Sequence, residues 1–228
     1  MINPIDSELC PVVTGVHYER LAGDVGWQAA EVIRCGEEPW YWLVNYAWTV
    51  QKDENVEGSA VNRFPPDDYL RYCFGLMFSE SFLVVDKSRQ MRMTWLLMAY
   101  ALWRAQFGNR EEIVCQTKQQ DIADTELVKR AFFMASNEPF WMRPNFGKND
   151  SSFCKLVFPG SKSLIRGIPS GGDKIRAYNP TRFILDEAGF LEGEFDECRT
   201  AALACCKDVK LVSTANGGQW GDFVNAIH

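Results

Sequence analysis

The stretch VVDKSRQMRMTWLLMAYALW, residues 84–103, consists of an apolar run, a short polar and basic loop, and a long apolar run. These runs predict a buried strand followed by a buried helix. Loops of the pattern G-x-x-x-x-G-K-[ST] bind phosphate groups between such a strand and helix. Laid on that pattern, Lys87 and Arg92 replace the two glycines, Met93 replaces the lysine, and only Thr94 matches. A phosphate-binding loop and a surface loop with solvated basic residues are both open at this point.

The composition excludes several classes of protein. The 228 residues are 46% hydrophobic, so the chain can bury a substantial core and disorder is not expected. The net charge of −6 argues against a generally basic nucleic-acid coat, so any DNA contact must come from a local patch. The cysteines form no C-x-x-C pair, which makes a zinc site improbable. Without a secretory signal or an apolar run near ~20 residues, we expect reduced thiols, a cytoplasmic location and no membrane.

Strands and helices alternate along the chain from residue 82 onward. Short apolar runs predict strands at 82–86, 112–117, 182–186 and 209–214, and an inserted hairpin at 153–158 and 163–168. Helical spacing predicts helices at 94–107, 119–135 and 195–206. This alternation predicts an α/β fold with a mainly parallel central sheet flanked by helices.

The N-terminal part carries fewer signals. Residues 1–35 are weakly patterned and broken by two glycines, and the aromatic-rich segment 37–50 is predicted to be helical. Residues 51–68 read as a loop and 68–78 as a helix. We expect 1–60 to form a helical, aromatic lead-in packed on a core of residues 61–228, although the aromatic segment could also bind another subunit.

Two further motifs begin where a predicted strand ends. RFILDEAGF, residues 182–190, places Asp186 and Glu187 at the end of a buried strand, where two carboxylates are costly unless a cation offsets them. LVSTANGG, residues 211–218, places hydroxyl and amide groups before a diglycine hinge. In an open α/β sheet, ligands bind beyond the carboxyl ends of the strands. The three motifs are therefore expected to meet at one edge of the sheet.

These motifs, in this order, resemble the ATPase domain of the large terminase subunit, the DNA-packaging motor of tailed bacteriophages. The resemblance rests on KSRQMRMTW, RFILDEAGFLEG and LVSTANGG, with IVCQTKQQDIADTELVKR between, and covers about residues 37–228. It implies a P-loop NTPase fold of the additional-strand, catalytic-glutamate type. It also implies Mg²⁺-dependent hydrolysis of ATP coupled to translocation of double-stranded DNA into a procapsid.

The resemblance also implies a role for each motif. The Walker A loop that binds the nucleotide maps onto Lys87, Ser88, Arg89, Gln90, Met91, Arg92, Met93 and Thr94. The metal-binding residues are Thr94 and Asp186, the catalytic base is Glu187, and the coupling motif comprises Ser213, Thr214 and Asn216.

The loop departs from the standard pattern at its cation. Met93 cannot neutralise phosphate charge, and phosphoryl transfer requires charge stabilisation. We therefore favour Lys87 as the cation, with Arg89 second. Arg176, on the loop GGDKIRAYNPT, is a candidate catalytic arginine, although a solvated or DNA-facing arginine is the commoner case.

The resemblance also implies partners and a location. They are double-stranded DNA, the portal and procapsid, the small terminase subunit, and further copies in a ring, in the cytoplasm of an infected bacterium and not in the mature virion. We expect no nuclease domain, because the nuclease carboxylates of a complete large terminase are not found here. Two other functions stay open: a nucleotide-binding assembly module with weak ATPase activity, and a helicase-like translocase.

Overall fold

The computed structural model describes residues 23–52, 59–191 and 193–227. By their contacts the residues form two compact units. Unit 1 comprises Met1–Gly75 and Phe133–Pro144, and unit 2 comprises Leu76–Phe132 and Asn145–His228. The domain boundary expected at residue 60, and the packing of the lead-in on the core, stay predictions. Most of the weakly patterned N-terminal segment lies outside the described residues.

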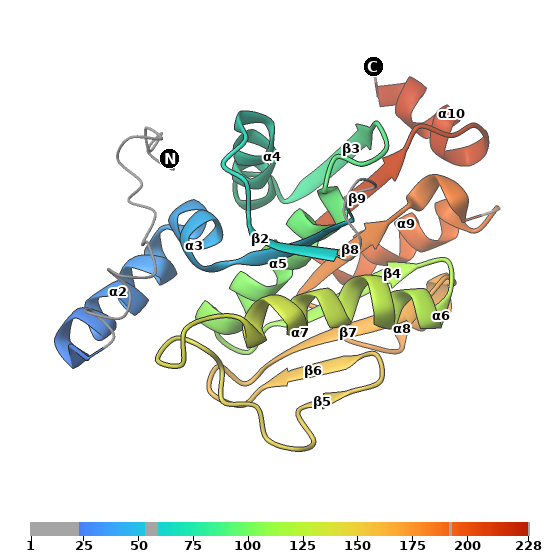
Figure 1. Cartoon of the computed structure of the whole chain (residues 1–228). Coiled ribbons are helices and arrows are strands. Elements are labelled where there is room, and N and C mark those ends of the chain that lie inside the picture. Colours follow the sequence, from blue (N-terminus) through green and yellow to red (C-terminus); the bar gives the residue numbers. More distant parts are fainter. Residues whose placement is uncertain (1–22, 53–58, 192, 228) are drawn as a thin grey trace. The chain divides into compact units, whose positions relative to one another are not determined.

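Unit 2 contains a seven-stranded sheet with the order β3-β9-β8-β4-β7-β6-β5, whose strands can be followed in Figure 1. The strands are β3 (Phe82–Lys87), β4 (Glu112–Thr117), β5 (Ser151–Ser152), β6 (Lys155–Phe158), β7 (Ser163–Pro169), β8 (Arg182–Asp186) and β9 (Asp208–Thr214). The five neighbouring strands β3, β9, β8, β4 and β7 pair in parallel. The β7–β6 and β6–β5 pairs of this sheet are antiparallel. The predicted mainly parallel sheet is confirmed.

The strand order matters because β9 lies between β3 and β8. β9, which ends in the coupling motif, therefore separates β3, which leads into the basic loop, from β8, which ends in the acid pair. This is the additional strand expected for this class of P-loop fold. It brings all three motifs to the carboxyl edge of the sheet.

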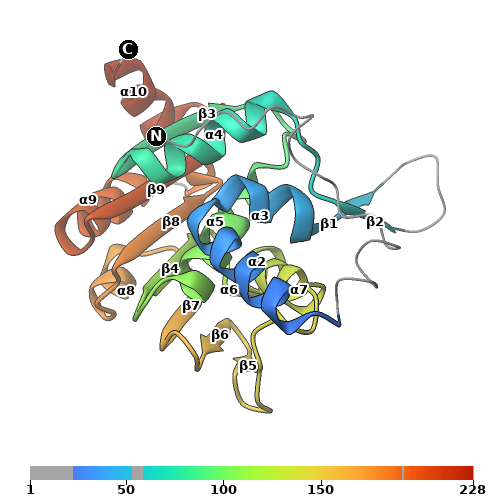
Figure 2. The same cartoon turned by 90° about the vertical axis from the view of Figure 1, so that its left-hand side faces the viewer.

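Alternate residues of the strands face opposite helical layers, as side chains do along a strand. On one face, Phe183, Leu185 and Leu211 pack with residues of α9 (Phe195–Cys205) in a buried cluster. α5 (Met93–Phe107) packs against β7 and β4, and Figure 2 shows α5 and α9 on opposite sides of the sheet. Both faces are covered, which explains why the strands read as continuous apolar runs.

The amino edge of the sheet carries a compact ion network. Arg182 donates to Glu111 Oε1 at 2.9 Å and also bonds Asp208. Lys210, at 0% exposure, places its Nζ 2.7 Å from Asp208 Oδ1. Burial lowers the pKa of Lys210, but the nearby Asp208 carboxylate favours its charged form. This network joins the starts of β4, β8 and β9.

The predicted helix at 119–135 is interrupted. α6 (Gln120–Ile122) leads into a π-helical segment (Ala123–Val128), which continues as α7 (Lys129–Ser136). The π-helical turn lies close to β7, since a side chain at Gly167 would meet the carbonyl oxygen of Ala123 at 3.1 Å. Its Asp124 is buried and accepts the Cys154 N–H at 2.7 Å. The sequence shows helical periodicity but not this tertiary contact, which accounts for the difference.

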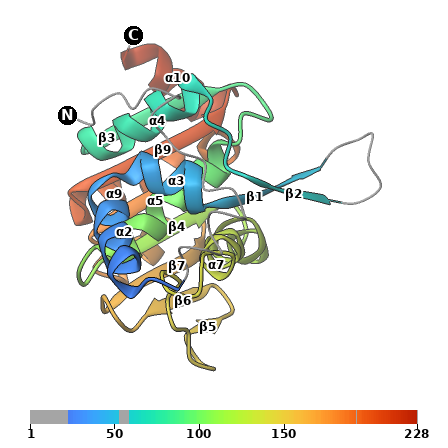
Figure 3. The same cartoon turned by 60° about the vertical axis from the view of Figure 1, so that its left-hand side comes forward.

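Unit 1 corrects three predictions. α2 (Val25–Glu37) forms in the segment taken as weakly patterned, because Asp24 caps it by accepting the Trp27 N–H at 2.9 Å. The predicted helix at 37–50 ends with α3 (Pro39–Tyr46), and β1 (Trp48–Lys52) follows. Part of the predicted loop forms β2 (Ser59–Arg63), which pairs antiparallel with β1, as Figure 3 shows. Cross-strand pairing supplies the backbone partners that local composition does not reveal.

Three more helical segments were not predicted from the sequence. They are α8 (Gly172–Arg176), the single 3₁₀ turn Ala188–Phe190 and α10 (Gly218–Ile227). The helix predicted at 68–78 is confirmed as α4 (Asp68–Ser79). Within the described ranges, no helix combines the length and apolar character needed to cross a bilayer.

The sheet core should respond strongly to truncation at Leu185. Leu185→Ala should lower the free energy of unfolding by about 2–5 kcal/mol, because this fully buried side chain leaves a cavity under α9. Leu203→Ala is the matched control, since Leu203 lies on α9 and is 44% exposed. Equal losses in urea-induced unfolding would contradict this assignment of the core.

Candidate functional site

The candidate site lies at the carboxyl edge of the sheet in unit 2. β3, β8 and β9 end at Lys87, Asp186 and Thr214, and α5 begins at Met93 directly after the basic loop. The parallel register pairs Lys87 with Thr214 and Asp186 with Val212. Residues that are about 130 positions apart in the chain thus meet at one edge. The meeting of the three sequence motifs follows from this alignment.

A hydrogen bond joins the loop helix to the acid pair. Thr94 Oγ1, in the first turn of α5, donates to Asp186 Oδ2 at 2.7 Å. Asp186 is 4% exposed, and burial raises its pKa to about 6, while the bond from Thr94 acts in the opposite direction. The other carboxylate oxygen, Oδ1, is buried and has no hydrogen-bond partner in the part of the chain that the structure describes. A cation beside Asp186 would therefore offset a real electrostatic cost.

Lys87 and Glu187 form an ion pair. Lys87 Nζ lies 3.0 Å from Glu187 Oε1 and 3.2 Å from Thr214 Oγ1. The Lys87 side chain is only 7% exposed, so these oxygens largely replace its water. Glu187 Oε2 also accepts the Thr214 N–H at 3.4 Å. The cation at the start of the loop and the second carboxylate are therefore held against each other by the end of β9.

The loop between Lys87 and α5 has an unusual backbone. Gln90 and Arg92 adopt left-handed conformations, with φ of 63° and 52°. This conformation favours glycine, and Arg92 stands where the standard loop has its second glycine. A left-handed residue next to a helical one directs successive N–H groups to one side, as in anion-binding nests. Arg92 therefore keeps a backbone conformation suited to glycine although it carries a side chain.

The remaining loop side chains differ in exposure. Ser88, Arg89 and Gln90 are exposed, and Met91 is half-buried. Met93 is buried at the start of α5, so its side chain belongs to the core. Lys87, Arg89 and Arg92 are the basic side chains of the loop, and Lys87 forms an ion pair with Glu187 of the acid pair.

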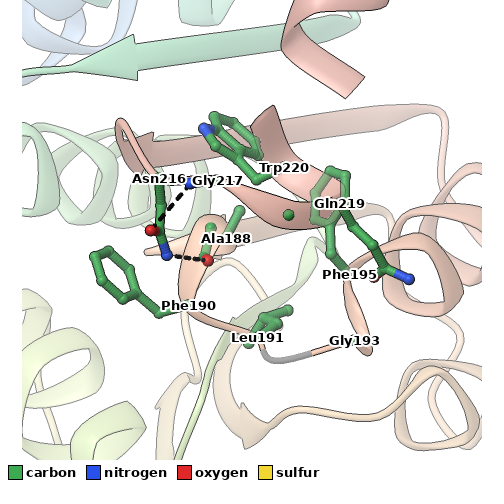
Figure 4. Close-up of a pocket in the computed structure, with 11 residues that line it drawn as sticks. Ala188, Phe190, Leu191, Gly193, Phe195, Asn216, Gly217, Gln219 and Trp220 are labelled. Atoms are coloured by element: carbon green, nitrogen blue, oxygen red, sulfur yellow. Dashed lines mark hydrogen bonds between the residues drawn. The ribbon is translucent and has the colours of Figure 1, made fainter. Parts of the chain in front are cut away.

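The coupling motif holds the turn after the acid pair. Glu187 is left-handed (φ 55°) and opens the turn Ala188–Phe190. Gly189 donates its N–H to Ser213 Oγ at 2.9 Å, and its carbonyl accepts Asn216 Nδ2 at 2.7 Å. Figure 4 shows the Asn216 amide directed at the backbone of this turn. Both peptide groups of Gly189 are thus bound by the motif at the end of β9.

Arg176 takes a different place. It lies on α8, after β7, and its guanidinium pairs with Asp173 Oδ1 at 2.7 Å on the same short helix. The Arg176 side chain is 48% exposed. Its role as a catalytic arginine therefore stays a prediction.

The site fits a divalent cation whose ligands come partly from the protein and partly from a bound substrate. A hydroxyl and a buried carboxylate with one oxygen unpartnered are hard oxygen donors of the kind that Mg²⁺ prefers. The described residues contain no cluster of three or more histidine, cysteine, aspartate or glutamate side chains that could hold a metal by itself. Magnesium commonly uses one or two protein ligands and completes its shell with water and phosphate oxygens.

Sequence reasoning missed three residues of this edge. Asp86 precedes Lys87 and accepts the indole N–H of Trp220 at 3.0 Å. Gly189 is needed because a Cβ there would lie 2.9 Å from Ser213 Oγ and 3.0 Å from Asn216 Cβ. The sequence signals were present but weak: an acid at the end of an apolar strand, and a single tryptophan after a diglycine.

Comparisons with known proteins support the fold. Neither a family model nor a curated protein matches the chain. Among solved structures, the large terminase of bacteriophage HK97 superposes with a TM-score of 0.61 at 16% identity, over 84% of this chain and 42% of that one. The large terminase of the thermophilic bacteriophage D6E in complex with ADP has a TM-score of 0.45 at 12% identity, over 60% of this chain and 34% of that one. The large terminase ATPase domain of Thermus phage P74-26 has a TM-score of 0.43 at 15% identity, over 69% of this chain and 73% of that one.

The similarity to the HK97 large terminase shows that this chain shares its fold with part of that protein. It supports the α/β fold with a mainly parallel central sheet flanked by helices. The chain spans less than half the length of the HK97 protein. The fold predicted from the sequence is confirmed.

The contact between the acid-pair turn and the coupling motif should tolerate no Cβ at Gly189. Gly189→Ala should lower the free energy of unfolding by about 1–3 kcal/mol, because Ser213 and Asn216 must move apart. Gly160→Ala is the control, since a Cβ at Gly160 would meet nothing within 4 Å. The close approach would be refuted if both variants unfolded at the same urea concentration.

Proposed function

We propose that the chain is the ATP-hydrolysing motor domain of a viral DNA-packaging terminase. The observation that carries the proposal is the meeting of Lys87, Thr94, Asp186, Glu187 and Thr214 at one edge of the sheet. A cation, a metal-binding pair, a second carboxylate and a polar strand end are the groups that phosphoryl transfer requires. The fold of the HK97 large terminase supports the same assignment.

In the proposed complex, the triphosphate of ATP lies over the loop and the N-terminus of α5. The positive end of the helix and the left-handed backbone at Arg92 favour phosphate there. Thr94 and Asp186 would hold Mg²⁺, which offsets charge on the β- and γ-phosphates. Lys87, which pairs with Glu187, would supply the positive charge that Met93 cannot.

Hydrolysis in this site requires Glu187 to leave Lys87. In the structure the two side chains neutralise each other. The γ-phosphate competes for the Lys87 ammonium, which releases the Glu187 carboxylate. Glu187 then accepts a proton from water as the water oxygen bonds to the γ-phosphorus, and ADP departs with the electrons of the broken P–O bond. The ion pair thus keeps the base occupied until a nucleotide arrives.

The coupling to DNA belongs to the same proposal. Glu187 and Thr214 are bonded, and the turn after Glu187 is bonded to Ser213 and Asn216. A change at Glu187 on hydrolysis therefore reaches β9 and the segment that follows it. We propose that this movement drives double-stranded DNA into a procapsid through its portal. The motor acts as a ring of copies with the small terminase subunit, in the cytoplasm of the infected bacterium.

A second candidate function is a nucleotide-binding assembly module with weak hydrolysis. It is favoured by Met93, which is buried where the standard loop has its lysine, and by the pairing of Lys87 with the proposed base. Binding of Mg²⁺-ATP without steady phosphate release by the wild-type chain, even at concentrations that drive self-association, would support this candidate over the motor.

The role of Glu187 predicts a loss of turnover without a loss of binding. Glu187→Gln should lower the rate of phosphate release by about 10²–10⁴-fold, because the amide cannot accept the proton of the attacking water. Its affinity for Mg²⁺-ATP in calorimetry should not weaken, because Lys87 loses a competing partner. Glu194→Gln, at an exposed position before α9, serves as the control. Turnover that survives in Glu187→Gln would remove this residue from the role of base.

The role of Lys87 predicts a loss of binding. Lys87→Ala should weaken the affinity for Mg²⁺-ATP roughly tenfold to hundredfold, because a hydrogen bond to a charged group contributes about 1.5–3 kcal/mol. Lys207→Ala is the control, since Lys207 is exposed beside the start of β9, at the opposite edge of the sheet. If both variants bound the nucleotide equally well in calorimetry, the cation of the site would have to be sought elsewhere.

A further inference from the structure

We infer that Trp220 of α10 is a positioning residue for hydrolysis, which holds the loop strand β3 and the acid-pair turn in a fixed relation. The inference rests on the proposed function and goes beyond the motifs seen in the sequence. It assigns a role to the first turns of α10, the helix that follows the coupling motif.

The first contact of Trp220 is with the strand of the loop. Its indole N–H donates to Asp86 Oδ1 at 3.0 Å, and Asp86 directly precedes Lys87 on β3. Trp220 is 1% exposed, so its indole N–H is held inside the protein, whereas the Asp86 carboxylate that accepts it lies at the surface. A hydrogen bond to a carboxylate is stronger than one between neutral groups. The indole therefore fixes the end of β3 next to the proposed phosphate-binding lysine.

The second contact is with the turn that follows Glu187. A Cβ at Gly189 would lie 3.2 Å from Trp220 Cδ1, so the ring is directly against the backbone of the turn. The same glycine is bonded to Ser213 and Asn216. One indole thus touches the strand that carries Lys87 and the turn that carries Glu187.

Two phenylalanine rings pack against the indole of Trp220. It packs edge-on against Phe195 of α9, with 5.4 Å between ring centroids, and also contacts Phe223 one turn later on α10. These contacts limit the rotation of the indole and keep its N–H directed at Asp86. The position of Trp220 is therefore set by the helical layer beneath the sheet.

The turn and the start of α10 also border a pocket. A pocket of about 430 Å³ lies between the turn Ala188–Leu191 and the start of α10, as Figure 4 shows. Gly217 and Gly218 line this pocket, and Gly218 is left-handed with a φ of 66°. The side chains of Asn216 and Trp220 both contact the turn, since the Asn216 amide donates to the Gly189 carbonyl and the Trp220 ring lies against Gly189. Loss of the indole should therefore let the end of β3, which carries Lys87, shift relative to the turn that follows Glu187.

The test is the steady-state kinetics of Trp220→Phe in the complete chain. This change keeps an aromatic ring and removes the N–H donor, so kcat for ATP should fall about tenfold or more while KM changes less than about threefold. A residue with a purely structural role would lower the folded fraction and leave KM and the kcat per folded molecule unchanged. Trp103→Phe, on the distant half of α5, is the matched control and should keep the wild-type kcat.

A second pair of variants keeps the inference testable if Trp220→Phe folds poorly. Asp86→Leu should reproduce the loss of kcat, and Asp86→Asn, which retains an acceptor oxygen, should lose less. In the double variant Trp220→Phe/Asp86→Leu the loss should be smaller than the product of the single losses, because both remove the same bond. A wild-type kcat in folded Trp220→Phe or folded Asp86→Leu would overturn the inference while the proposed function stands. The same conclusion would follow if the loss of kcat in the double variant equalled the product of the two single losses. Absence of turnover in the wild-type chain would instead defeat the proposed function, and the inference with it.

Discussion

The hydrogen bond between Thr94 and Asp186 is the interaction on which the site depends. It joins the first turn of α5 to the end of β8, although β9 lies between β8 and the strand that leads into α5. The loop must therefore pass beyond the end of β9 before the helix begins. This path brings Lys87, Thr214 and the acid pair within reach of one another. Without the additional strand, the same motifs would form a different site.

The two edges of the sheet differ in how their charges are paired. At the amino edge, Arg182 meets Glu111 at 2.9 Å and Lys210 meets Asp208 at 2.7 Å, so the charges are balanced within the protein. At the carboxyl edge, Lys87 pairs with Glu187, and Asp186 keeps a buried oxygen without a hydrogen-bond partner in the described residues. An imbalance of negative charge in a buried position calls for a cation. The charges of the amino edge are paired within the protein, and the carboxyl edge is where we propose that the ligand binds.

Backbone conformation at this edge departs from what the residue types prefer. Gln90, Arg92 and Glu187 all adopt left-handed conformations that cost about 1–3 kcal/mol each for residues other than glycine. Such conformations persist only where the surrounding structure imposes them. Here α5 begins directly after Arg92, and the coupling motif binds the turn after Glu187. Arg92 thus adopts a left-handed backbone at the position where the standard loop pattern has a glycine.

The parallel sheet and most residues at its carboxyl edge could be predicted from local patterns in the sequence. Apolar runs predicted the strands that end at Asp186 and Thr214, because burial on both faces leaves a continuous local signal. Which of these residues contact one another follows from the folded structure and could not be read from the sequence. The pairing of Lys87 with Glu187, the need for Gly189 and the bond from Trp220 to Asp86 join positions far apart in the chain. The hairpin of β1 and β2 and the π-helical turn before α7 also escaped prediction, since strand pairing and close packing depend on partners that no local pattern names.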